Sequence, residues 1–112
     1  ERTVEHLDCR AVAGAANDTL GDPADAHALA ERGIAYVPDF VANAGGVVHI
    51  HSLRSGWSRA RLRREVLRIG ERAGAVLEQA DRDGVTPMEV AEGIAATRLA
   101  AARAAPLEAV AS

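Results

Sequence analysis

The feature that most constrains the fold is the stretch Pro38-Asp39-Phe40-Val41-Ala42-Asn43-Ala44-Gly45-Gly46. We interpret it as the end of a buried strand that breaks into an asparagine and two glycines before a helix begins. Such an end presents backbone N–H groups and one amide side chain at the carboxyl edge of a sheet, where open α/β sheets bind ligands. Residues 12–17 end another short apolar run on small residues and an asparagine. We therefore expect two neighbouring strand ends that form one shared site.

The segments around these two ends predict a strand, helix, strand unit. A short strand is predicted at residues 9–13. Asp22 can cap a helix that has Pro23 at its first position, and Gly33 can stop that helix. A second strand is predicted at residues 34–37, so the simplest arrangement is two parallel strands joined by a right-handed crossover.

The rest of the chain carries helix signals. One helix is predicted within residues 44–52, and Ser55 with Gly56 marks a turn after it. Ser58 is expected to cap a long helix whose apolar positions alternate steps of three and four residues. This pattern gives the helix one apolar face.

The last helix has the clearest start. Gly84 closes the long helix, and Thr86 followed by Glu89 three residues later predicts a reciprocal capping box. Residues 1–57 thus form a strand and helix part, and residues 58–105 form the terminal helices.

The composition indicates which classes of partner and which cellular compartment to expect. A net charge of −3 and a pI near 5.8 leave no broad basic field for nucleic acid. Nothing resembles a signal peptide or a membrane span, so we expect a cytoplasmic protein without nucleic-acid or membrane partners. The single cysteine, Cys9, excludes an internal disulfide, and we interpret it as a small buried residue.

Other polar residues favour structural roles. His49 and His51 stand two apart with no third ligand nearby, so we expect no metal site. Asp39, beside Pro38, is expected to order the turn. A group of arginines on the long helix is interleaved with glutamates, which predicts a solvated helix face; it comprises Arg59, Arg61, Arg63, Arg64 and Arg68.

The two asparagine segments, Ala13-Gly14-Ala15-Ala16-Asn17 and residues 38–46, with Gly33-Ile34-Ala35-Tyr36-Val37 between them, resemble the Glu/Leu/Phe/Val dehydrogenase family. Gly56-Trp57-Ser58 and residues 80–87 are similar to the end of its phenylalanine dehydrogenase branch. The resemblance covers nearly the whole chain but only the last third of such an enzyme. It implies the carboxyl-terminal part of a Rossmann-type NAD-binding domain followed by long helices, as a fragment without the amino-terminal substrate domain.

The resemblance also implies roles for the two strand ends. Asn43 would touch the substrate carboxylate and the neighbouring nicotinamide of NAD, and Asn17 would contact the nicotinamide ribose or carboxamide. Gly14, Ala15 and Ala16 would leave room for the cofactor. From the residues alone, either asparagine could simply close a turn. No G-x-G-x-x-G fingerprint opens a helix, so the adenine half of NAD would bind elsewhere.

The long helix would line the substrate side-chain pocket in similar enzymes. Small residues at Gly70, Ala73, Gly74 and Ala75 would leave space there for a bulky substrate, although close helix packing explains them equally well.

The function implied is NAD-dependent oxidative deamination of phenylalanine or a branched-chain amino acid by a homo-oligomeric enzyme. All 13 basic residues are arginine, whereas the family uses lysines of its amino-terminal domain for catalysis. We therefore expect no catalytic residue in this chain and no turnover from it alone. The alternatives are a non-catalytic helical interaction module or an inactive truncated relic.

Overall fold

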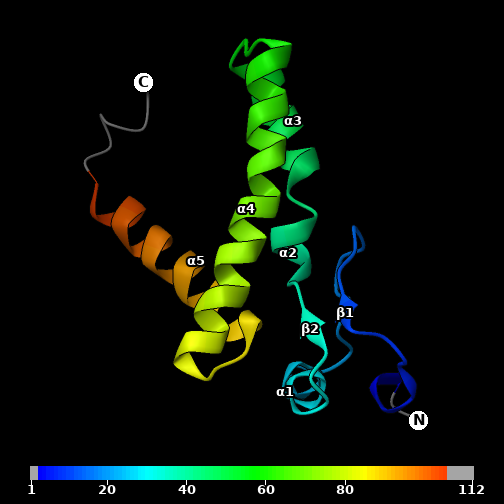
Figure 1. Ribbon diagram of the computed structural model, residues 1–112. Coiled ribbons are helices and arrows are strands. Elements are labelled where there is room, and N and C mark those ends of the chain that lie inside the picture. Colours follow the sequence, from blue (N-terminus) through cyan, green and yellow to red (C-terminus); the bar gives the residue numbers. More distant parts are fainter. Residues whose placement is uncertain (1–2, 106–112) are drawn as a thin grey trace.

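The computed structural model describes residues 3–105 and has a helix-rich α/β architecture (Figure 1). The elements in chain order are η1 (Thr3–His6), β1 (Ala11–Val12), α1 (Ala24–Glu31), β2 (Ala35–Tyr36), α2 (Asp39–Ala42), α3 (Gly45–Arg54), α4 (Arg59–Asp83) and α5 (Pro87–Ala104). In the described part of the chain, no helix combines the length and apolar character that a bilayer crossing requires.

The predicted strand, helix, strand unit is confirmed. β1 and β2 pair in parallel, with Val12 opposite Tyr36, and α1 connects them. At the start of α1 the Asp22 carboxylate accepts a hydrogen bond from the Ala24 N–H at 2.8 Å. At its end Gly33 has φ +68°, the left-handed conformation that a glycine adopts without strain.

The interpretation of residues 38–41 as a strand end is wrong, because β2 ends at Tyr36 and α2 begins at Asp39. The Pro38 carbonyl accepts hydrogen bonds from the N–H groups of Val41 and Ala42, which closes a helical turn. The Asp39 carboxylate accepts from the Phe40 N–H at 2.6 Å. Asn43 therefore follows a short helix rather than a strand.

Both ends of α4 and the start of α5 lie where the sequence predicts. Ser58 caps α4 by accepting from the Arg61 N–H, and Gly84 ends α4 at φ +66°. Thr86 and Glu89 form the complete capping box of α5. Local side-chain chemistry therefore determines both ends of the α4–α5 turn.

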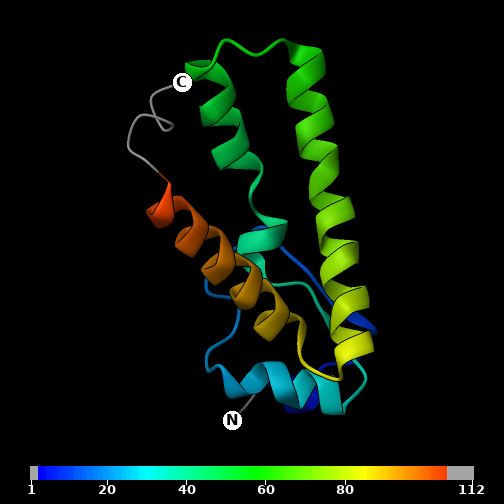
Figure 2. The same cartoon turned by 90° about the vertical axis from the view of Figure 1, so that its left-hand side faces the viewer.

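Two separate clusters form the core. The first, in the α/β half, comprises Val4, Leu29, Ile34 and Tyr36. The second, where α5 crosses α4, comprises Val76, Ala80, Val90 and Ala91. Figure 1 shows α5 passing behind α4, and Figure 2 shows α3 and α4 running in opposite directions.

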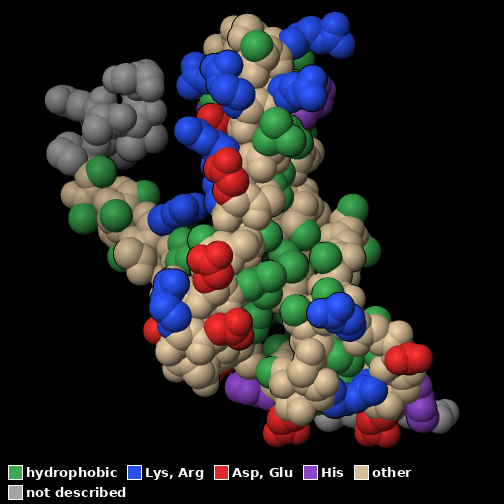
Figure 3. All heavy atoms as spheres, viewed as in Figure 1, with side chains coloured by type: hydrophobic (Ala, Val, Ile, Leu, Met, Phe, Trp, Pro, Cys, Tyr) green, Lys and Arg blue, Asp and Glu red, His purple; other side chains and the backbone are tan. Residues whose placement is uncertain are grey.

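Each cluster receives a side chain from the other half of the molecule. Met88 of α5 packs against the first cluster, and Val41 of α2 packs against the second. In Figure 3 hydrophobic side chains gather where α2 faces α4, while basic side chains gather toward the start of α4. Cys9 is exposed, contrary to expectation, because β1 begins only at Ala11.

Candidate functional site

The two asparagines meet at the carboxyl ends of the paired strands. Asn17 lies in the loop after β1, and Asn43 lies directly after α2. The Asn43 side-chain amide donates to the Asn17 side-chain oxygen at 2.5 Å. The structure thus brings together two residues that lie 26 positions apart in the sequence.

This contact leaves a defined set of hydrogen-bonding groups for a ligand. An asparagine side chain has two donor hydrogens and one acceptor oxygen. Once the pair is formed, both donor hydrogens of Asn17 and the acceptor oxygen of Asn43 remain unused by it. A primary carboxamide, which carries one acceptor and one donor group side by side, is complementary to this arrangement.

The loop beside the pair is open to a ligand. Gly14, Ala15 and Ala16 are all exposed. A Cβ atom added to Gly14 would meet nothing within 4 Å. The small residues that the sequence singles out are therefore open to solvent next to Asn17.

The start of α3 lies two residues after Asn43. Gly45 begins this helix one residue after Ala44, which provides no side-chain cap. The first N–H groups of a helix lack partners within the helix and favour negatively charged ligands. They are a second set of donors near Asn43.

An apolar groove of about 300 Å³ lies on the other flank of α2. Phe40 and Val41 border it from α2, Ala75 and Val76 from α4, and Ile94 from α5. Of the small residues predicted to line a side-chain pocket, Ala75 lines this groove, whereas Gly70, Ala73 and Gly74 do not.

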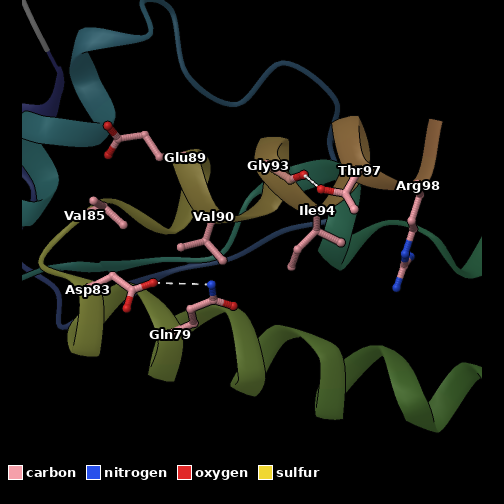
Figure 4. Close-up of a pocket in the computed structure, with 9 residues that line it drawn as sticks. All are labelled: Gln79, Asp83, Val85, Glu89, Val90, Gly93, Ile94, Thr97 and Arg98. Carbon is pink, nitrogen blue, oxygen red and sulfur yellow. Dashed lines mark hydrogen bonds between the residues drawn. The ribbon is translucent and has the colours of Figure 1, made fainter. Parts of the chain in front are cut away.

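A wider hollow of about 570 Å³ separates the end of α4 from α5 (Figure 4). Val90 and Ile94 point toward α4, and the Gln79 side chain donates to the Asp83 carboxylate at 3.3 Å. At one end of the hollow, the backbone N–H and hydroxyl of Thr86 donate to the Glu89 carboxylate and lower its pKa. None of the predicted site residues lines this hollow.

The remaining polar residues contact other parts of this chain and are expected to have structural roles. The Asp39 carboxylate accepts from the Thr19 N–H at 3.3 Å, so it orders two loops. The His51 ring lies edge-on to Trp57 at 5.0 Å, and the Arg61 guanidinium lies 4.2 Å above Trp57. Within residues 3–105, no three His, Cys, Asp or Glu side chains come together as a metal site.

The arginine group lies exposed along α4, as the sequence predicts. Arg68 and Arg72 both approach Glu65, at 2.9 and 3.6 Å. An exposed pair of this kind contributes little to stability.

Sequence reasoning missed Thr19 and Tyr36, whose hydroxyls lie 2.8 Å apart beside the asparagine loop. No pattern in the sequence marks either residue, because their contact depends on how the loop folds back over β2. Each is also a residue type common in strands and turns.

Comparisons with known proteins agree with the resemblance. The family model described as Glutamate/Leucine/Phenylalanine/Valine dehydrogenase matches residues 1–106. The chain is 38% identical to a valine dehydrogenase of Streptomyces albus over 104 residues, which are 93% of this chain and 29% of the relative. It is 35% identical to a phenylalanine dehydrogenase of Bacillus thermotolerans over 101 residues, covering 90% of this chain and 26% of that enzyme.

The fold agrees as well. The crystal structure of L-tryptophan dehydrogenase from Nostoc punctiforme superposes with a TM-score of 0.81 at 31% identity, covering 92% of this chain and 32% of that one. The similar identities to valine and phenylalanine dehydrogenases do not favour the phenylalanine branch. The chain spans less than a third of the length of these curated relatives, and it belongs to the Glu/Leu/Phe/Val dehydrogenase family of amino-acid dehydrogenases.

Proposed function

We propose that this chain forms the nicotinamide side of an NAD-dependent L-amino-acid dehydrogenase. The reaction converts an L-amino acid, NAD⁺ and water to a 2-oxo acid, ammonium, NADH and a proton. In this proposal residues 1–57 are the end of a Rossmann-type NAD-binding domain, and the complete enzyme is a homo-oligomer. The observation that carries the proposal is the Asn17–Asn43 contact at the carboxyl ends of two parallel strands.

The donor and acceptor groups of the pair fit the cofactor. The open donors of Asn17 and the open oxygen of Asn43 match the carboxamide of nicotinamide, and Gly14, Ala15 and Ala16 leave room for the ring. When bound, NAD⁺ supplies the acceptor for the hydride that leaves the substrate α-carbon. The amides orient the reacting groups without adding charge to the site.

The substrate would occupy the space between the pair and the apolar groove. Asn43 would hold the substrate carboxylate through the amide hydrogen that it does not donate to Asn17, assisted by the first N–H groups of α3. The groove bordered by Phe40, Val41 and Ile94 would accept an apolar side chain. This arrangement fits phenylalanine or a branched-chain amino acid.

The proton chemistry requires groups that this chain does not supply. It contains no lysine, and the Asp39 carboxylate reaches the asparagine loop only by accepting from the Thr19 N–H. Asp39 is already engaged by two backbone N–H groups. The 112-residue chain alone should therefore not reduce NAD with phenylalanine or leucine, and detectable reduction would contradict this proposal.

The test is Asn43→Ala in the complete dehydrogenase that carries this chain. Removal of a positioned donor should lower kcat/KM about 100-fold without unfolding the protein, because Asn43 is only half-buried. Ser55→Ala, which removes a polar group at the far end of α3, is the matched control and should keep kcat/KM. Normal kcat/KM for Asn43→Ala would reject the assigned role.

A helical interaction module is the second candidate, and α3 provides the observation that favours it. Val47, Ile50 and Leu53 of this helix are 73%, 60% and 70% exposed. Such a stripe is typical of a surface that another chain or domain covers. If the chain is an interaction module, Ile50→Glu should abolish its association with a partner, and Asn43→Ala should leave that association unchanged.

A further inference from the structure

We propose that Thr19 is a positioning residue that holds Asn17 in contact with Asn43. Only the effect of Thr19 on catalysis rests on the proposed function. Its effect on the Asn17–Asn43 contact can be measured in this chain whatever the function is. Residues 13–18 are all exposed, so packing does not fix the loop that carries Asn17. The first anchored residue after Asn17 is Thr19.

The hydroxyl of Thr19 ties the loop to the strand beneath it. It lies 2.8 Å from the hydroxyl of Tyr36, whose side chain is only 2% exposed. A buried phenol is costly to leave without a hydrogen-bond partner, so the pair favours one position of the loop. Tyr36 belongs to the first core cluster and cannot move without disturbing Leu29 and Ile34.

The backbone of Thr19 ties the loop to α2. Its N–H donates to the Asp39 carboxylate at 3.3 Å. The carbonyl of the same Asp39 accepts from the Asn43 N–H at 2.7 Å. Thr19 and Asn43 therefore both hydrogen-bond to Asp39, Thr19 to its carboxylate and Asn43 to its backbone carbonyl. Through Asp39, Thr19 is linked to the backbone of Asn43.

The residue between Asn17 and Thr19 turns the chain sharply. Asp18 has φ +50°, a left-handed conformation that aspartate tolerates better than most residues. This turn lets the Asn17 side chain face Asn43 while Thr19 returns to Tyr36 and Leu20 packs against the first cluster. Among the described residues, the side-chain hydrogen bonds that hold the loop tip are those of Thr19 and the Asn17–Asn43 bond.

The chain offers an unusually direct readout, because it contains only two asparagines, Asn17 and Asn43. Labelling asparagine with ¹⁵N in the 112-residue protein thus yields two side-chain amide groups. In the native protein we expect a nuclear Overhauser contact between them and a downfield Asn43 amide proton. Both signs should be lost in Thr19→Val, which keeps the shape and the backbone N–H but removes the hydroxyl.

Three further variants sharpen the test. Tyr36→Phe should cause the same loss, and Thr19→Ser, which keeps the hydroxyl, should restore the native spectrum. Thr97→Val is the matched control, because its hydroxyl bonds only the Gly93 carbonyl within α5. Native asparagine signals in both Thr19→Val and Tyr36→Phe, with the fold intact, would overturn the inference.

The catalytic consequence is measured in the complete dehydrogenase. Thr19→Val should lower kcat/KM for NAD roughly three- to tenfold, the effect of one net hydrogen bond, and Thr19→Ser should restore it. Looser positioning should also raise the primary deuterium isotope effect with an α-deuterated amino acid, which a mere loss of folded protein would not do. If Thr19→Val leaves both kcat/KM and the isotope effect unchanged, the positioning role is overturned. If the wild-type enzyme itself is inactive, the proposed function is rejected, but the spectroscopic test of the Thr19 contact still applies.

Discussion

The α/β half and the helical half of this chain are organised by different kinds of contact. In the helical half both ends of α4 and the start of α5 are set by residues within a few positions of them: Ser58, Gly84 and the Thr86–Glu89 box. In the α/β half the hydrogen bonds that shape the site join residues 17 to 26 positions apart. The first half is thus built by long-range side-chain contacts, and the second by local ones.

This difference explains where the chain carries its candidate chemistry. A site formed by the loop after β1 and the residue after α2 needs side chains brought together from separate segments, and α4 and α5 cannot provide that by themselves. The helices instead supply the apolar groove and half of the core. Val41 and Met88, each packed against the other half's cluster, join the two regions.

The largest expected effect is from Leu29→Ala, in the first cluster. Leu29 is 1% exposed, and a buried leucine truncated to alanine costs about 2–5 kcal/mol of unfolding free energy. Tyr36 and Trp57 are the only tyrosine and tryptophan; Tyr36 belongs to the first cluster, and Trp57 lies against Arg61 at the start of α4, so their fluorescence reports separately on the first cluster and on the α3–α4 turn during denaturation. The Tyr36 transition should move to lower denaturant by more than the Trp57 transition.

The matched control is Leu99→Ala in α5, where the side chain is 58% exposed. It should change stability by less than about 0.5 kcal/mol. Equal shifts of both transitions in Leu29→Ala would show that the first cluster and the α3–α4 turn unfold as one unit, and the contrast between the regions would then apply to structure but not to stability.

The same contrast decides how much could be predicted from the sequence. Ser58, Gly84 and the Thr86–Glu89 box act within one helical turn, so the sequence predicts the limits of α4 and α5 closely. The strand end assigned to residues 38–41 is a helix, because Pro38 and Asp39 start a turn that apolar character alone does not reveal. The Thr19–Tyr36 contact could not be predicted, since it depends on the path of the whole loop.

A glycine pair tests the local rule in the helical half. Gly84→Ala places a side chain at φ +66° and should destabilise the protein by about 1 kcal/mol. Gly93 lies inside α5, and a Cβ atom there meets nothing within 4 Å. Gly93→Ala should therefore stabilise the helix by up to about 1 kcal/mol. Thermal unfolding of both variants checks the opposite signs, and destabilisation by both would contradict the local account.

The smallest effect concerns the pH dependence of the α5 capping box. Hydrogen bonds from the Thr86 backbone N–H, and then from its hydroxyl, lower the pKa of the Glu89 carboxyl below its ordinary value of 4.5. A carboxyl whose pKa is lowered by folding stabilises the fold above its unfolded pKa and loses that contribution as the pH falls through the folded value.

Unfolding of the wild type between neutral and acidic pH should thus show a loss of stability that Glu89→Gln lacks in this window. Glu92→Gln, on an exposed position of the same helix, is the control and should keep the wild-type pH dependence. If the wild type and Glu89→Gln lose stability identically as the pH falls, the ionised Glu89 carboxylate does not stabilise the fold through the capping box.

The most direct test of the central claim is a titration of the ¹⁵N-asparagine-labelled protein with NAD, followed through its two side-chain amide groups. If the strand ends form the nicotinamide side of a dehydrogenase site, the signals of Asn17 and Asn43 should both shift and saturate together, and adenosine diphosphate, which lacks the nicotinamide, should not reproduce the shift. Asparagine signals that stay in place while NAD saturates other resonances of the protein would contradict the claim.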